Sequence, residues 1–166
     1  MGKPGAGLNS TDEDASGWHR LENSEEVEMN TKRWVEAGGA AFAVTFVLDM
    51  IVHGKLLMGL YEQTASVWRG KGESHEMMWL MALGQLLFGL VFAWIYAKGY
   101  EAGKPGLGQG LRYGFLIGLL LSIIDVSIWY VVLPIPFALA AGWVAGALVD
   151  CLAAGAVVGL IYRPRR

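Results

Sequence analysis

The sequence is poor in the residues that give a protein a covalent framework or a soluble surface. It holds one cysteine, Cys151, so an intrachain disulfide framework is excluded. Charged residues make up only 17% of the 166 residues, whereas hydrophobic residues make up 54%. This composition is unlike that of an ordinary soluble globule and favours a membrane protein.

Motifs that would indicate chemistry are also lacking. The stretch "GKPGLGQG" has no Lys-Ser/Thr ending of a phosphate-binding loop, and no nucleotide, haem or iron–sulfur motif occurs. The sequence contains no recognisable nucleophile with a paired base and no standard spacing of metal ligands. We therefore expect no enzyme, no cofactor, no bound metal and no nucleic-acid partner.

Residues 1–30 differ in composition from the rest of the chain. They are rich in Gly, Ser, Asn and acids and cannot bury enough apolar surface to offset the entropy of ordering. We expect a disordered acidic tail, without the short apolar core of a secretory signal. Because "MNTKRW" from Met29 resembles a natural start, residues 1–28 are either part of the native protein or an upstream extension.

Four long apolar segments follow, at about 34–60, 77–97, 111–133 and 137–162. Crossing a hydrocarbon core about 30 Å thick takes about 20 helical residues, and each segment reaches that length. The segments lack the alternation of barrel strands, and only helices or closed barrels satisfy their backbone in lipid. Residues 31–166 are therefore predicted to form an all-α, four-helix transmembrane bundle in contact with the lipid bilayer.

Short connections and basic residues predict the topology. "LPIPF", residues 133–137, is so short that the third and fourth spans must form a tight antiparallel hairpin. Orientation follows from Lys and Arg alone. The side with both termini holds Lys32, Arg33, Lys98, Lys104, Arg112, Arg163, Arg165 and Arg166. The other side holds Lys55, Arg69 and Lys71. We therefore expect both termini to face the cytoplasm.

Polar side chains within the spans are costly, so they usually face other helices or a wet cavity. At 1.5 Å of rise per residue, Asp49, Gln85 and Asp125 fall at nearly the same depth, in the outer half of the bilayer. Asp150 falls deeper, below the midplane. We predict that two carboxylates and an amide meet inside the bundle, with Asp150 beneath them and reached through water.

Helical spacing adds two residues to this group. His53 follows Asp49 by four residues and is its natural partner, and Ser122 shares a helix face with Asp125. Carboxylates held together in a low dielectric share protons, which a proton-coupled site requires. Two simpler interpretations stay open. The polar residues form hydrogen bonds between helices, each worth about 0.6 to 2 kcal/mol, or Asp49, His53 and Asp125 hold a divalent metal.

Small residues recur at every fourth position in the second and fourth spans. The glycines concerned are Gly89, Gly142, Gly146, Gly155 and Gly159. Such rows let helices approach closely. The contacts lie either inside one bundle or between two copies of the chain.

The stretches "VLDMIVHGKLLMGLYEQTASVWR", "LFGLVFAWIYAKGYE", "GLRYGFLIGLL", "LPIPF" and "GLIY" carry a resemblance that covers most of residues 30–162. The chain resembles a family of small bacterial four-span membrane proteins with a domain of unknown function. The resemblance implies four helices and a bacterial inner (plasma) membrane location, and it brings no catalytic or binding residues.

Two hypotheses follow from the sequence. In the first, the chain is a non-enzymatic membrane protein, alone or as a homodimer, that couples protons to the movement of a small solute or ion through Asp49, His53, Asp125 and Asp150. In the second, it is an accessory or assembly subunit that packs into a larger membrane complex through its glycine rows.

Overall fold

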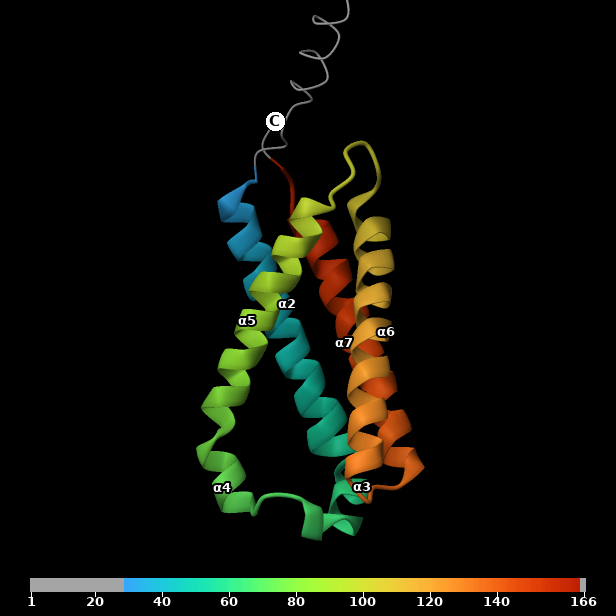
Figure 1. Ribbon diagram of the computed structural model, residues 1–166. Coiled ribbons are helices and arrows are strands. Elements are labelled where there is room, and N and C mark those ends of the chain that lie inside the picture. The colour runs from blue at the N-terminus through green and yellow to red at the C-terminus, as the bar shows by residue number, and fades with distance from the viewer. Residues whose placement is uncertain (1–28, 165–166) are drawn as a thin grey trace, which may run out of the picture. The chain divides into compact units, whose positions relative to one another are not determined.

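The structure, a computed structural model, describes residues 29–164 (Figure 1). Four long helices form its frame: α2 (Thr31–Ile51, extended by η1, Val52–Leu56), α5 (Met78–Lys98), α6 (Gly106–Val132) and α7 (Phe137–Ile161). Each is long and apolar enough to cross a membrane. No strand occurs in this part of the chain, so the predicted all-α four-helix bundle is confirmed.

Most of the predicted disordered tail, residues 1–28, lies outside the described residues. Its last residue, Asn30, lies just before α2. The Asn30 side chain accepts a hydrogen bond from the backbone N–H of Arg33 at 3.2 Å and so caps α2.

The first span ends at Leu56, before the predicted residue 60, because its last turn is a π-helix. The backbone N–H of Leu57 bonds to the carbonyl of Val52 at 2.8 Å, one residue further back than in an α-helix. The chain then bends and forms three short helices: α3 (Met58–Gln63), η2 (Ala65–Val67) and α4 (Lys71–Glu76). The connection between the first and second spans is thus largely helical.

The long helices pack in the order α5, α2, α7, α6, with α2 against both α5 and α7 (Figure 1). We call the end of the bundle with Thr31, Lys98, Gly106 and Ile161 the terminal end. The opposite end, with residues 57–77 and 133–136, is the loop end. Figure 1 shows α5 close to α2 toward the terminal end and separated from it toward the loop end.

Glycines set the close packing of α6 on α7. A Cβ atom on Gly110 would collide with the carbonyl oxygen of Gly155, and one on Gly106 would collide with that of Gly159. This contact explains why α6 begins at Gly106 instead of the predicted residue 111. Backbone packing holds "GLGQG" in a helix despite the low helix propensity of glycine.

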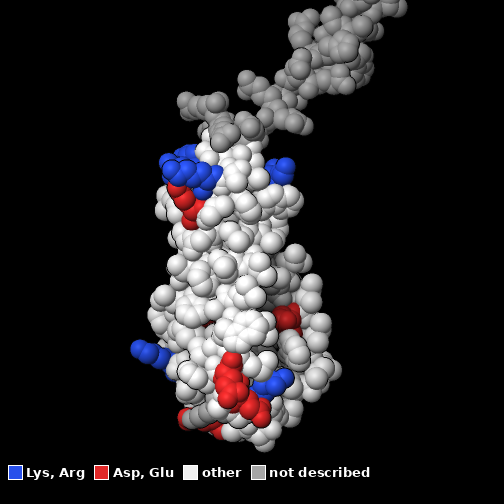
Figure 2. Space-filling view, turned by 90° about the vertical axis from the view of Figure 1, so that its left-hand side faces the viewer, with Lys and Arg blue, Asp and Glu red and all other residues white. Residues whose placement is uncertain are grey.

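Two apolar clusters lie at the two ends of the bundle. The terminal-end cluster includes Ala37, Ala41, Phe92, Ala93, Tyr96, Ala154, Val158 and Tyr162. The loop-end cluster is Leu57, Ile135, Leu139 and Ala140. On the face shown in Figure 2, most charged side chains lie toward the two ends and an acid is visible about midway along the bundle, with a belt without charge between that acid and the terminal end. A belt of this kind fits the hydrocarbon region of a bilayer.

Candidate functional site

A cavity of about 390 Å³ lies in the loop-end half of the bundle and is lined by acids and aromatic rings. It is bounded by α2 with η1, by α6 and α7, and by the connection after η1. Its lining residues are Asp49, His53, Tyr61, Trp68, Asp125, Trp129, Leu133, Trp143, Ala147 and Asp150. We call it the acid cavity. The structure thus brings Asp49, His53, Asp125 and Asp150, from three different helices, to one space.

Asp49 is the centre of this group. The side-chain amide of Gln85 on α5 donates a hydrogen bond to Oδ2 of Asp49. Oδ1 of Asp49 lies 3.6 Å from Nε2 of His53, one helical turn further along. The Asp150 carboxyl lies against that of Asp49, close enough for a hydrogen bond when either is protonated. Gln85 itself does not line the cavity but holds one of its carboxylates in place.

The position of Asp150 differs from the sequence expectation. We expected it beneath the other acids and reached through water, whereas it lies directly beside Asp49. The depth calculation did not include the packing of α7 against α2, which brings the two carboxyls together. Asp150 is only 8% exposed, and its Oδ1 atom has no hydrogen-bond partner among the described residues. Such an unpaired buried oxygen is costly unless something in the cavity satisfies it.

A hydrogen-bonded pair of aromatic side chains extends the network toward the loop end. The indole Nε1 of Trp143 donates to the Tyr61 hydroxyl at 2.7 Å, and that hydroxyl lies 2.7 Å from Nδ1 of His53. Because indole N–H can only donate, the Tyr61 hydroxyl proton is free to bond Nδ1 of His53. Neutral His53 then carries its proton on Nε2, which faces Asp49.

Tyr61 lies outside the spans and is protonated at neutral pH. Burial raises the pKa of its hydroxyl, an effect that the hydrogen bond from Trp143 opposes and the negative charge of Asp49 reinforces. The order Tyr61, His53, Asp49, Asp150 is therefore a continuous series of groups that can donate, accept or hold a proton.

Asp125 and Ser122 occupy the α6 side of the site. Asp125 and Trp129 are exposed, and the Trp129 indole donates to the Asp125 carboxylate at 3.1 Å. Ser122 is buried, and its hydroxyl donates to the Gly118 carbonyl of its own helix at 2.6 Å. Ser122 lines a neighbouring space together with Asp125 and does not reach the acid cavity.

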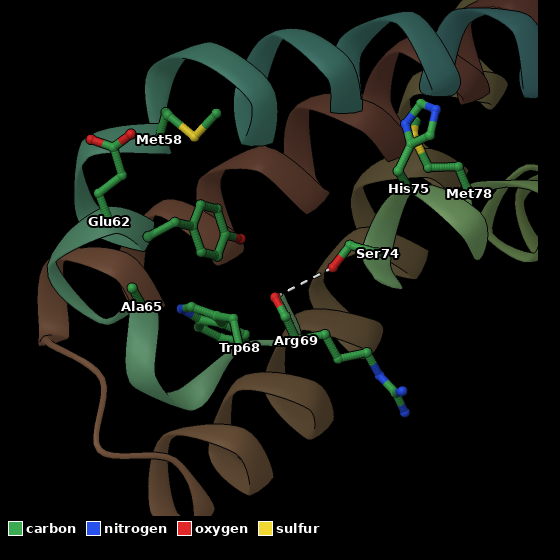
Figure 3. Close-up of a pocket in the computed structure, with 9 residues that line it drawn as sticks. Met58, Glu62, Ala65, Trp68, Arg69, Ser74, His75 and Met78 are labelled. Atoms are coloured by element: carbon green, nitrogen blue, oxygen red, sulfur yellow. Dashed lines mark hydrogen bonds between the residues drawn. The ribbon is translucent and has the colours of Figure 1, made fainter. Parts of the chain in front are cut away.

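A second cavity, of about 500 Å³, adjoins the acid cavity at the loop end (Figure 3). Tyr61 and Trp68 line both cavities. In Figure 3, Met58 and Glu62 lie on one side of this space and His75 and Met78 on the other. The two shared rings therefore separate the acid cavity from a wider space outside the spans.

The glycine rows are engaged within the chain. Gly89 packs on the backbone of Gly38 and Phe42. In α7, Gly155 and Gly159 pack against the backbone of α6, and Gly142 and Gly146 face Leu57 and Val52. The row on α7 thus supports both the α6 contact and the π-helical turn that carries His53.

The sequence did not indicate three of the site residues: Tyr61, Trp68 and Trp143. Trp143 precedes Asp150 by seven residues, two helical turns, so it lies on the same face of its helix, and this spacing could have indicated it. Tyr61 could not have been found from spacing, because the π-turn and the bend at Leu57 break the helical register.

The fold and the cavity define a polytopic helical membrane protein with an internal acidic and aromatic site. In comparisons with known proteins, no family model, curated protein or solved structure matches the chain. The predicted resemblance to bacterial four-span proteins therefore stays a prediction. Among residues 29–164, no three His, Cys, Asp or Glu side chains are placed to hold a metal ion.

Proposed function

We propose that the protein is a non-enzymatic, multi-pass protein of a bacterial inner membrane that couples proton movement to the transport of a small solute or ion. The observation that carries the proposal is the acid cavity, where Asp49, Asp125, Asp150 and His53 line one space among apolar helices. Carboxylates in a low dielectric cannot all stay ionised without a counter-charge, so they bind protons or cations.

The arrangement of donors supports a route for protons between the cavity and the loop end. Tyr61 and His53 connect Asp49 with the boundary of the wider cavity, in steps of 2.7 Å and 3.6 Å. We propose that the loop end faces the outside and that both termini are cytoplasmic, in line with the distribution of Lys and Arg.

The alternative hypothesis is that the protein is an accessory or assembly subunit. It depended on the glycine rows being contacts for a partner protein. Those glycines pack against other helices of the same chain. No feature of the described residues favours the subunit over the transporter.

Proteoliposomes with a trapped pH indicator test the proposal. Gradients of ammonium salts, amino acids, sugars and alkali cations are applied in turn, and the luminal pH is followed. We expect at least one gradient to move protons in the wild type and in Glu62→Gln, a control acid outside the acid cavity, and none in Asp49→Asn or Asp125→Asn. A response that both cavity variants retain, or no response to any gradient, would contradict the proposal.

A further inference from the structure

The acid cavity combines negative charge with several aromatic rings, a pairing that selects among possible ligands. Three acids and four aromatic side chains line the same space of about 390 Å³: Asp49, Asp125, Asp150, Tyr61, Trp68, Trp129 and Trp143. An acidic cluster alone would suit a proton, a metal ion or water. The aromatic rings do not suit these ligands, because they present π faces and few hydrogen-bonding groups to the cavity.

The aromatic rings on the loop-end side are held at steep angles to one another. Tyr61 and Trp68 meet at 77° with centroids 5.3 Å apart, and Trp68 and Trp143 meet at 68° with centroids 6.1 Å apart. Trp129 adds a ring from α6. Trp68 packs edge to face against both neighbours, and all four rings line the cavity. They form an aromatic cage of the kind that binds quaternary ammonium groups through the negative faces of the rings.

The acid side of the cavity holds a buried oxygen without a hydrogen-bond partner. Asp150 is 8% exposed, lines the cavity, and its Oδ1 has no donor among residues 29–164. The charge beside it is negative, from Asp49. A proton shared by the two carboxyls would satisfy this oxygen, and a cation in the cavity would offset the repulsion between their negative charges.

A metal cation fits these walls poorly. Hard cations such as Mg²⁺ and Ca²⁺ need six or more oxygen ligands at short range, and soft cations need thiolate or imidazole sets. The residues that the structure describes offer no such group. Indole and phenol rings cannot replace those ligands, whereas they bind the diffuse charge of an alkylated ammonium ion well.

We infer that the acid cavity is a binding site for a small organic ammonium cation, which the acids hold by charge and the aromatic cage by cation–π contact. The inference rests on the proposed transport function and names its substrate class. Because a proton and an ammonium group would occupy the same carboxylates, the two exclude each other, as an exchange of one for the other requires.

Two ligands of matched shape show whether binding requires a positive charge on the ligand. Choline and 3,3-dimethylbutan-1-ol have nearly the same shape, but only choline carries a positive charge. In equilibrium dialysis with the purified full chain in lipid nanodiscs, we expect choline to bind at least about tenfold more tightly than the uncharged analogue, the ratio that about 1.4 kcal/mol produces. Equal binding of both, or displacement of choline by equimolar Na⁺, would overturn the inference.

Variants of the residues that line the acid cavity show where choline binds. Trp129→Leu should weaken choline binding at least about threefold, the lower range of a cation–π contact. Asp150→Asn removes a negative charge and should weaken choline binding at least as much. Two matched controls should leave it unchanged. Glu62→Gln removes an acid from the wider cavity only, and Trp79→Leu removes an exposed tryptophan of α5. Loss of binding in Glu62→Gln but not in Asp150→Asn would place the ligand in the wider cavity and overturn the assignment.

The two proposals fail in different ways. If another solute drives proton movement through Asp49 while choline and its analogue bind equally, transport stands and the ammonium assignment is wrong. If choline binds in an Asp150-dependent manner but no gradient moves protons, the binding site stands and the transport function is wrong. Size-exclusion profiles of each variant show whether a loss of binding reflects misfolding.

Discussion

The Tyr61 hydroxyl accepts a hydrogen bond from the Trp143 indole at 2.7 Å, although the two residues are 82 positions apart. This bond fixes the connection after the first span onto α7. It also leaves the hydroxyl proton for Nδ1 of His53. One side chain outside the spans therefore determines which nitrogen of His53 faces Asp49.

Tyr61→Phe should impair proton movement without unfolding the protein. The ring keeps its packing against Trp68, but Trp143 and His53 each lose a hydrogen-bond partner. We expect a loss of about 0.5–1.5 kcal/mol in stability and at least a tenfold slower proton flux in proteoliposomes. Thr64→Val is the control, since it removes a neighbouring hydroxyl that bonds Trp68 and not His53. Similar flux in Tyr61→Phe and wild type would exclude Tyr61 from the proton route.

Gly110→Ala should separate α6 from α7. The added methyl group would meet the backbone carbonyl of Gly155, which has no rotamer with which to move away. We expect destabilisation of about 1–3 kcal/mol, measured as a lower thermal midpoint in detergent. Gly108→Ala on the same helix has open space around its Cβ, and it should be neutral or stabilising because alanine favours helix. Equal midpoints for the two variants would contradict the close contact.

Ion pairs in the connection between α5 and α6 should make the stability of the protein depend on pH. Hydrogen bonds from Lys104 first, and then from Arg112, lower the pKa of Glu101 below its ordinary value of 4.5. A lowered pKa means that the stabilisation is complete above 4.5 and is lost as pH falls through the lower value in the folded state. Glu101→Gln should therefore have a lower thermal midpoint than wild type at neutral pH, and the difference should close in acid. A difference that persists in acid would show that charge is not its cause.

Cysteine labelling tests the orientation. Cys151 is buried, so a Cys151→Ala background gives a low blank. Ser66→Cys places a thiol in the exposed connection at the loop end, and Ala102→Cys places one between α5 and α6. In intact cells a membrane-impermeant maleimide should label the first and not the second. The opposite pattern would place the termini outside the cytoplasm.

The four spans could be predicted from the sequence because each depends on a long local run of apolar residues. Their ends could not, since they depend on contacts between distant segments. Gly106 is helical because α7 lies against it, and the first span ends at Leu56 because its last turn is a π-helix. Amino-acid composition and helix propensity do not reveal either contact.

Part of the site could also be predicted, because it depends on spacing along the sequence. Spacing of four residues placed His53 near Asp49, and matching depths placed Gln85 beside the same carboxylate. The direct approach of Asp150 to Asp49 was not predicted, because depth along straight axes does not include how α7 packs against α2. The prediction missed Trp68 and Trp143 because tryptophans in membrane proteins are usually read as interfacial anchors. It missed Tyr61 because the π-turn breaks the helical register.

The π-helical turn at Val52–Leu56 sets the rotational phase of everything that follows it. Its backbone bond closes over one residue more than an α-helical turn holds, and each residue of an α-helix turns the chain by about 100°. A regular α-helix through the same residues would have no such surplus residue in its turn. The α3 segment would then rotate by roughly a quarter of a turn about the helix axis, which would carry the Tyr61 hydroxyl away from both the indole and the imidazole. The single surplus residue thus acts as an angular offset that aligns a connection outside the spans with groups inside them.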